Sequence, residues 1–327
     1  MFRAMRLVWM VLGVGGLSAG VACGGGSGDV DDSTSTSGSG AGSTSSAGGM
    51  GGGTTSAGGS MTTSTGGAGT GGGEGGAPPV WPTCDTQPSD VPAKTINEIW
   101  SDDPAMPEPV WVAGVYVTAV SASGCGAGNG CQIFVQQAET FPNIAAGSQQ
   151  ALKLFASPAT AMHFEGIAVG DQIDILAHAW RYDVGGQNEL LLQVANNLPG
   201  CAKVVGTGTP LPVEGLVIED LTVELYEQTM GPLLVKIDAV SGSPDMPNEL
   251  FGLWPAFNPG TQPLEEVTSL SPYMLPGSVF VGLQQDLIHN FESITGVFSL
   301  FVPPQAPPTK FEVLYIRSMD DAVVGGT

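Results

Sequence analysis

The segment from residue 24 to residue 79 sets the first limit on what this chain can fold into, because it consists almost entirely of Gly, Ser, Thr and Ala. A segment of this composition cannot bury enough apolar surface to offset the conformational entropy that folding removes. We therefore expect residues 23–79 to form a disordered spacer, whose r.m.s. reach is roughly 40 Å. The roughly 250 residues beyond it suit one or two domains.

The first 22 residues have the features of a signal peptide. Arg3 and Arg6 precede an uncharged apolar run at 7–22, which is shorter than the about 20 residues that a bilayer-spanning helix needs. The sequence Gly20-Val21-Ala22-Cys23 resembles the lipobox of bacterial lipoproteins, although Gly20 stands where that family usually has Leu. The resemblance implies a lipid on Cys23 and an outer-membrane location, with the spacer as a tether. Ordinary cleavage after Ala22 is the alternative.

The chain has five cysteines, and an odd number needs an explanation in an exported protein, where thiols tend to pair. A lipid on Cys23 accounts for the odd cysteine. The other four allow three connectivities, of which we expect Cys125 with Cys131, across a Gly-rich loop, and Cys84 with Cys201. The alternative is four buried free thiols.

Short runs rich in Val, Ile, Leu and aromatic residues, bounded by Gly, Pro, Asn and Asp, predict strands throughout the region beyond residue 80. In the first half they lie at 110–120, 131–138, 151–157, 172–182 and 188–195; in the second, at 232–240, 250–257, 291–302 and 310–317. The segments 95–100 and 219–229, which come before the first run of each half, are expected to cover a barrel end as a short helix or loop.

Two of these runs alternate most regularly. Their apolar sides are predicted to carry Trp111, Ala113, Val115, Val117 and Ala119 in the first run, and Leu233, Val235, Ile237 and Ala239 in the second. Gly114 stands at the centre of the first run, where a glycine relieves crowding in a strongly bent strand.

The two halves therefore repeat one order of elements, and this order resembles the OB-fold, a five-stranded barrel. The resemblance is carried by residues 95–99, 114–120, 133–136, 170–171 and 188–190, and by 221, 224, 226–227, 234–235, 294–296 and 317–321. It extends to the tandem OB-like modules that accompany secreted bacterial nucleases or stand alone on envelope lipoproteins. We expect an all-β chain with two tandem five-stranded OB-fold-like barrels at 80–205 and 206–327.

The sequence does not indicate an enzyme. It contains no G-x-S-x-G, P-loop or H-E-x-x-H motif, and its three histidines, His163, His178 and His289, are far apart. Acidic pairs such as Asp171 with Asp174 belong to no recognised calcium loop. We expect no cofactor and no metal, and a hydrolase with an unrecognised site is kept as an alternative.

Binding is the remaining class of function. OB-folds commonly bind through the face of their second and third strands. The predicted ligand-binding residues are Tyr116, Gln132, Phe134, Gln136 and Trp180, whose rings and amides could stack bases or sugars, or could cover the junction between the halves. The region 80–327 has seven Lys and Arg against 27 Asp and Glu, which disfavours nucleic acid.

The resulting hypothesis is a non-enzymatic, lipid-anchored envelope protein that serves as a binding or structural module for an unknown protein or glycan. A single-stranded nucleic-acid-binding accessory of a nuclease is the alternative.

Overall fold

The computed structural model describes residues 81–126, 130–182, 188–242, 253–259, 266–271, 274, 288–301 and 310–325. The predicted signal peptide (1–22), Cys23 and the spacer (23–79) lie outside these residues, as do the turn at 183–187 and the loop at 303–308. The described part of the chain includes no helix long and apolar enough to span a bilayer.

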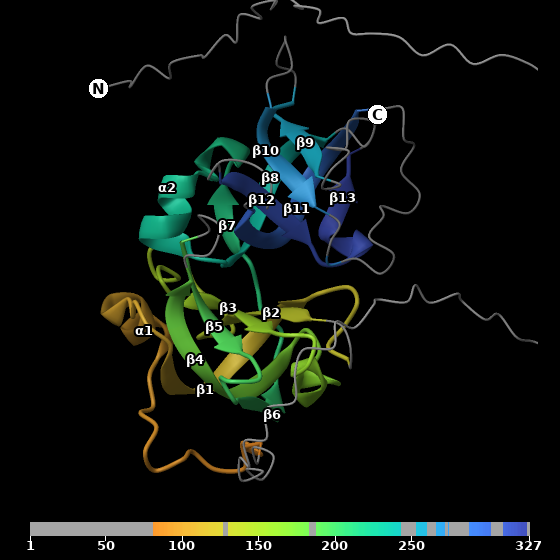
Figure 1. The fold of residues 1–327 in the computed structure, drawn as a ribbon. Coiled ribbons are helices and arrows are strands. Elements are labelled where there is room, and N and C mark those ends of the chain that lie inside the picture. The colour runs from red at the N-terminus through yellow and green to blue at the C-terminus, as the bar shows by residue number, and fades with distance from the viewer. Residues whose placement is uncertain are drawn as a thin grey trace, which may run out of the picture. The chain divides into compact units, whose positions relative to one another are not determined.

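The first half is a closed barrel, which we call barrel 1 (Figure 1). Its strands are β1 (Glu108–Val120), β2 (Cys131–Gln136), β3 (Ala151–Ala156), β4 (Asp171–Tyr182) and β5 (Glu189–Val194). They pair in the order β1-β2-β3-β5-β4, and β1 closes the ring by pairing with β4. Only the β3–β5 pair of this ring is parallel. A sixth strand, β6 (Cys201–Thr207), extends the sheet beside β4.

The second half, barrel 2, repeats this order. Its strands are β8 (Leu234–Gly242), β9 (Trp254–Phe257), β10 (Glu266–Ser271), β11 (His289–Phe301) and β12 (Phe311–Ile316). They pair in the order β8-β9-β10-β12-β11, β11 returns to β8, and β10–β12 is the parallel pair. Two short strands extend this sheet, β7 (Val213–Leu216) and β13 (Ala322–Val324). Because both rings have the strand order of an OB-fold, the prediction of two tandem OB-like barrels is confirmed.

A short helical segment precedes the first strand of each barrel. In barrel 1 it is α1 (Ile96–Asp102), which begins with a capping box between Thr95 and Glu98 and buries Ile96, Ile99 and Trp100 in the core. In barrel 2, α2 (Val223–Leu225) continues into η3 (Tyr226–Met230), whose Tyr226 and Met230 are core residues. These are the two segments that the sequence predicts as covers. Within the described residues, the 3₁₀ turns are η1 (Ala161–Phe164), η2 (Ile218–Asp220) and η5 (Met319–Asp321).

The predicted alternation of β1 is correct at Val115 and Val117 and wrong at Trp111, Ala113 and Ala119. The pairing of β1 with β4 shifts by one residue between Val112 and Val115, which is a β-bulge, and Gly114 has a φ of +63°. The core therefore takes Val110 and Val112 before the bulge and Val115 and Val117 after it. Trp111 packs instead against both cysteines of the Cys84–Cys201 pair, Ala113 is exposed, and Ala119 packs against residues of barrel 2.

The predicted alternation of β8 is also wrong at one position, where the backbone has a positive φ. Leu233, Val235 and Ile237 are buried in the core as predicted, whereas Ala239 is exposed and has a φ of +54°. The core position goes to Val240.

Side chains of β4 satisfy the backbone groups that the bulge leaves unpaired. The Gly114 N–H donates to the Asp174 carboxylate at 2.8 Å, and the Gln172 side-chain amide donates to the Gly114 carbonyl at 3.0 Å. Buried backbone groups of this kind need a partner. Asp174, which the sequence pairs with Asp171 as a candidate acidic site, therefore has a structural role.

Gly114→Ala is expected to lower the free energy of unfolding by about 1–2 kcal/mol, because a side chain is strained at positive φ. The added Cβ would also lie 3.3 Å from the Gln172 Nε2 atom. Urea denaturation measures the change. Gly126→Ala is the control, since its Cβ would meet no atom within 4 Å and its φ is not positive. Equal stabilities of the two variants would contradict the assignment of strain to Gly114.

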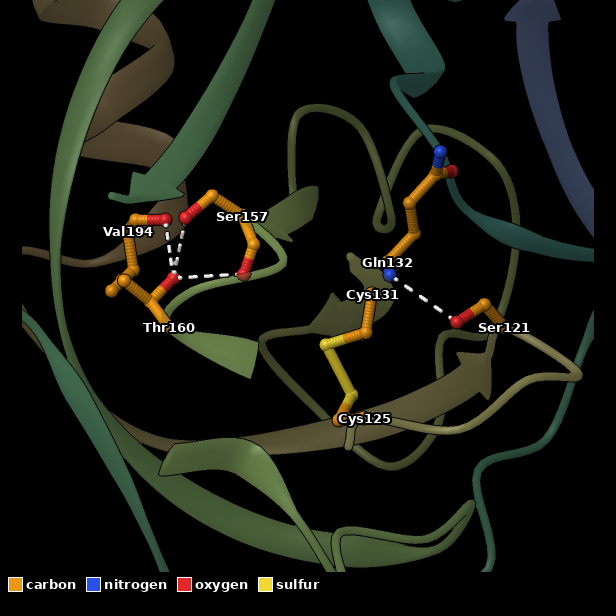
Figure 2. Close-up of a disulfide and its surroundings, with 7 residues drawn as sticks. All are labelled: Ser121, Cys125, Cys131, Gln132, Ser157, Thr160 and Val194. Carbon is orange, nitrogen blue, oxygen red and sulfur yellow. Dashed lines mark hydrogen bonds between the residues drawn. A yellow bond between two sulfur atoms is a disulfide. The ribbon is translucent and has the colours of Figure 1, made fainter. Parts of the chain in front are cut away.

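Two disulfides are present, Cys84–Cys201 and Cys125–Cys131, which is the expected connectivity. The first joins the segment before α1 to the start of β6, and the second closes the loop between β1 and β2 (Figure 2). Disulfides persist in oxidising compartments and are rare in the cytosol. They therefore indicate an extracellular or envelope environment for the folded region.

Candidate functional site

Four partly exposed side chains form a row across the outer face of barrel 1. In the strand register, Gln132 on β2 lies opposite Phe155 on β3, Phe155 lies beside Gln193 on β5, and Gln193 lies opposite His178 on β4. Paired residues of neighbouring strands project from the same face of a sheet. We call Gln132, Phe155, Gln193 and His178 the cross-strand row. Figure 2 shows the Gln132 side chain pointing away from the Cys125–Cys131 disulfide.

A second register row lies next to the first and contains Trp180, Leu191, Lys153 and Phe134. The Trp180 indole N–H donates to Oε1 of Gln193 at 2.9 Å, and its ring packs edge-on against Tyr182 with the centroids 5.2 Å apart. Trp180 therefore fixes the orientation of the Gln193 amide within the cross-strand row.

A cavity of about 250 Å³, the row pocket, opens over these strands. Barrel 1 contributes Gln132, Lys153, Phe155, Tyr182, Glu189, Leu191 and Gln193 to its lining. Strands β11 and β12 of barrel 2 contribute Leu300, Phe301 and Tyr315. The pocket thus combines the outer face of one barrel with a wall from the other.

One ion pair lies in the wall of the row pocket. The Lys153 ammonium group contacts the Glu189 carboxylate, and these side chains are 13% and 8% exposed. The other oxygen of Glu189 accepts a hydrogen bond from the hydroxyl of Tyr226, in η3 of barrel 2, at 2.9 Å. Burial, with the nearby charge of Glu189, raises the pKa of Tyr226 well above its ordinary value, so the phenol stays protonated and donates.

His178, the fourth member of the cross-strand row, adds no charge to this face. Partial burial lowers the pKa of its imidazole, so the ring is neutral at pH 7. The described residues also contain no group of three His, Cys, Asp or Glu side chains placed to hold a metal ion. The face is therefore polar and aromatic, with its opposite charges paired.

The structure places the predicted ligand-binding residues in three locations. Gln132 lines the row pocket and Trp180 lies beside it. Phe134 is fully buried, with its ring 5.9 Å from that of Tyr315 in barrel 2, so it covers the junction instead of facing a ligand. Gln136 is also buried, and its amide donates to the carbonyls of Ala138 and Glu139.

Tyr116 lies elsewhere, against the chain that follows β6. A Cβ on Gly208 would be 2.6 Å from the Tyr116 ring, which shows how closely the two residues pack. Tyr116 is not among the described residues that line the row pocket.

Several lining residues were not predicted. Phe155 and Gln193 lie at half-buried positions of the strands that the sequence predicts at 151–157 and 188–195, and their places in those strands are the signal that could have found them. Leu300, Phe301 and Tyr315 reach the pocket only because β11 and β12 pack against barrel 1. No local pattern in the sequence encodes that packing.

No family model and no curated protein matches the sequence. Among solved structures, the chain is similar to a putative aspartyl-tRNA synthetase from Leishmania major Friedlin, with 9% identity and a TM-score of 0.25 over 39% of this chain and 23% of that chain. It is also similar to a Replication Protein A heterotrimer bound to ssDNA, again with 9% identity and a TM-score of 0.25, over 64% of this chain and 49% of that chain. The fold assignment depends on the strand order alone.

Proposed function

We propose that this protein is a non-enzymatic binding protein, anchored to the bacterial outer membrane by lipid on Cys23, and that the row pocket holds its ligand. One observation carries the proposal: three side chains of the cross-strand row, Gln132, Phe155 and Gln193, line a cavity on the face that OB-folds commonly use for binding. Ligand sites usually combine apolar walls with a few placed polar groups. The row pocket has this composition.

The anchor is supported by the sequence and by the disulfides. The apolar run that ends at Cys23 and the Gly/Ser/Thr-rich spacer would present the folded region at a distance from the lipid. The two disulfides fit the oxidising compartment that such an anchor requires.

Single-stranded nucleic acid is less well supported as the ligand. Nucleic-acid binding depends on unpaired Lys and Arg that neutralise phosphates. Among the described lining residues of the row pocket, the one cation is Lys153, and it is already paired with Glu189. The net charge of −22 repels a phosphate backbone at long range.

Native mass spectrometry of the full-length protein, extracted from the envelope in detergent, tests both parts of the proposal. We expect a mass increase on Cys23 that corresponds to attached acyl chains. We also expect a non-covalent ligand that is retained by the wild type and lost from Phe155→Ala. Gln228→Ala, a change at an exposed amide outside the row pocket, is the control and should retain the ligand.

An unmodified Cys23 would contradict the anchor. A wild-type protein that carries no ligand after exposure to envelope extract would contradict the binding function.

A further inference from the structure

The lining residues of the row pocket that the structure describes carry no net charge. Lys153 and Glu189 are its charged lining residues, and they form an ion pair with each other. The second oxygen of Glu189 is occupied by the Tyr226 hydroxyl. A charged ligand group would have to break this network or be desolvated without a partner, and both are costly. The pocket therefore favours a neutral ligand.

Three polar groups of the pocket remain available to a ligand. The side-chain amide of Gln132 and the hydroxyl of Tyr182 make no hydrogen bond to any residue that the structure describes. The side-chain carbonyl oxygen of Gln193 accepts the hydrogen bond from Trp180, so the side-chain N–H groups of Gln193 can donate to a ligand. Together these groups supply both donors and acceptors, and each hydroxyl of a ligand can donate and accept.

The placement of these groups around Phe155 restricts the shape of the ligand. Gln132 lies on one side of Phe155 in the register and Gln193 on the other. A flat ring between two amides suits a ligand that has an apolar face and polar groups around its whole edge. The row pocket has a volume of about 250 Å³, which is slightly below the roughly 300–1,000 Å³ of pockets for drug-sized ligands. The ligand is therefore small.

From this arrangement, and resting on the proposed function, we infer that the row pocket binds an uncharged sugar ring. The pyranose stacks its C–H face on Phe155 and directs its hydroxyls to Gln132, Gln193 and Tyr182. The ring can be a free monosaccharide or one residue of a longer neutral glycan, because the recognition chemistry is the same.

Isothermal titration of the full-length protein in detergent, with three matched sugars, tests the inference. Glucose is the neutral probe, glucuronic acid replaces one hydroxymethyl group by a carboxylate, and glucosamine replaces one hydroxyl by an ammonium group. Galactose, N-acetylglucosamine and cellotriose extend the neutral set, and cellotriose separates a glycan chain from a free sugar. Adenosine and an oligothymidylate test bases and nucleic acid.

We expect saturable binding of at least one neutral sugar, and about tenfold or more weaker binding of its charged counterpart. Phe155→Ala should weaken the neutral sugar about tenfold through lost stacking. Gln132→Ala should weaken it about three- to tenfold. Gln228→Ala should leave the affinity unchanged.

Three outcomes would overturn the sugar assignment: tighter binding of glucuronic acid or adenosine than of every neutral sugar, neutral-sugar binding that survives Phe155→Ala, or no binding of any neutral sugar. The mass-spectrometric experiment separates this failure from that of the proposed function. A ligand of another class that is lost on Phe155→Ala would leave the row pocket as a binding site, whereas no retained ligand would remove both.

Discussion

Replacing Cys84 and Cys201 together by alanine is expected to lower the free energy of unfolding by about 4–5 kcal/mol. The bond closes a loop with a sequence separation of 117 residues, so it removes a large conformational entropy from the unfolded chain. Both cysteines are 4% exposed, and they pack with Trp111 and Leu176 in a small cluster outside the barrel core. Guanidinium denaturation followed by tryptophan fluorescence measures the loss.

The second disulfide provides the matched control. Cys125 and Cys131 have a sequence separation of only 6, so the double alanine variant at these positions is expected to lose about 2 kcal/mol. If both double variants lost the same free energy, loop-closure entropy would not be the main contribution of the Cys84–Cys201 bond.

Glu189→Leu is expected to cost about 3 kcal/mol or more, because it leaves the Lys153 ammonium group buried without its partner. The same change removes the acceptor of the Tyr226 hydroxyl. The double variant Lys153→Met with Glu189→Leu should recover most of this loss, since replacing both members of a buried pair by apolar side chains is often close to neutral. Urea denaturation of the two single variants and the double variant completes the cycle.

Tyr226→Phe is the control for the hydrogen bond alone, and its expected cost is about 1 kcal/mol. A double variant that is as unstable as Glu189→Leu would show that the ion pair itself stabilises the fold, and would contradict the expectation.

The sequence predicted the barrels well because a strand that is buried on one face leaves a period-two pattern. That pattern located the strands β1 to β5 of barrel 1 and β8, β9, β11 and β12 of barrel 2, whereas β10 was missed. It also placed Leu233, Val235 and Ile237 in the core. It failed at Gly114 and Ala239, where a positive φ changes the side on which the next residues project. Local composition does not reveal such a change in advance.

The extra strand β6 was missed for a different reason. Lys203 and Val204 on β6 are exposed, so the strand has no buried face to produce alternation. The row pocket was only partly predictable as well. Gln132 and Trp180 follow from outward positions on predicted strands, whereas the wall formed by Phe301 and Tyr315 depends on how two barrels pack together.

The Cys84–Cys201 bond also has a mechanical consequence for a tethered protein. Tension that enters the described chain from residue 81 reaches Cys84 after three residues, and the covalent bond passes it directly to β6. If the lipid anchor is present, drag on a molecule held at Phe155 is transmitted through the β3–β5, β5–β4 and β4–β6 pairs. The chain between the two cysteines, whose sequence separation is 117, cannot be pulled out lengthwise. With such an anchor and a ligand in the row pocket, the cross-link would help barrel 1 to hold that ligand against flow.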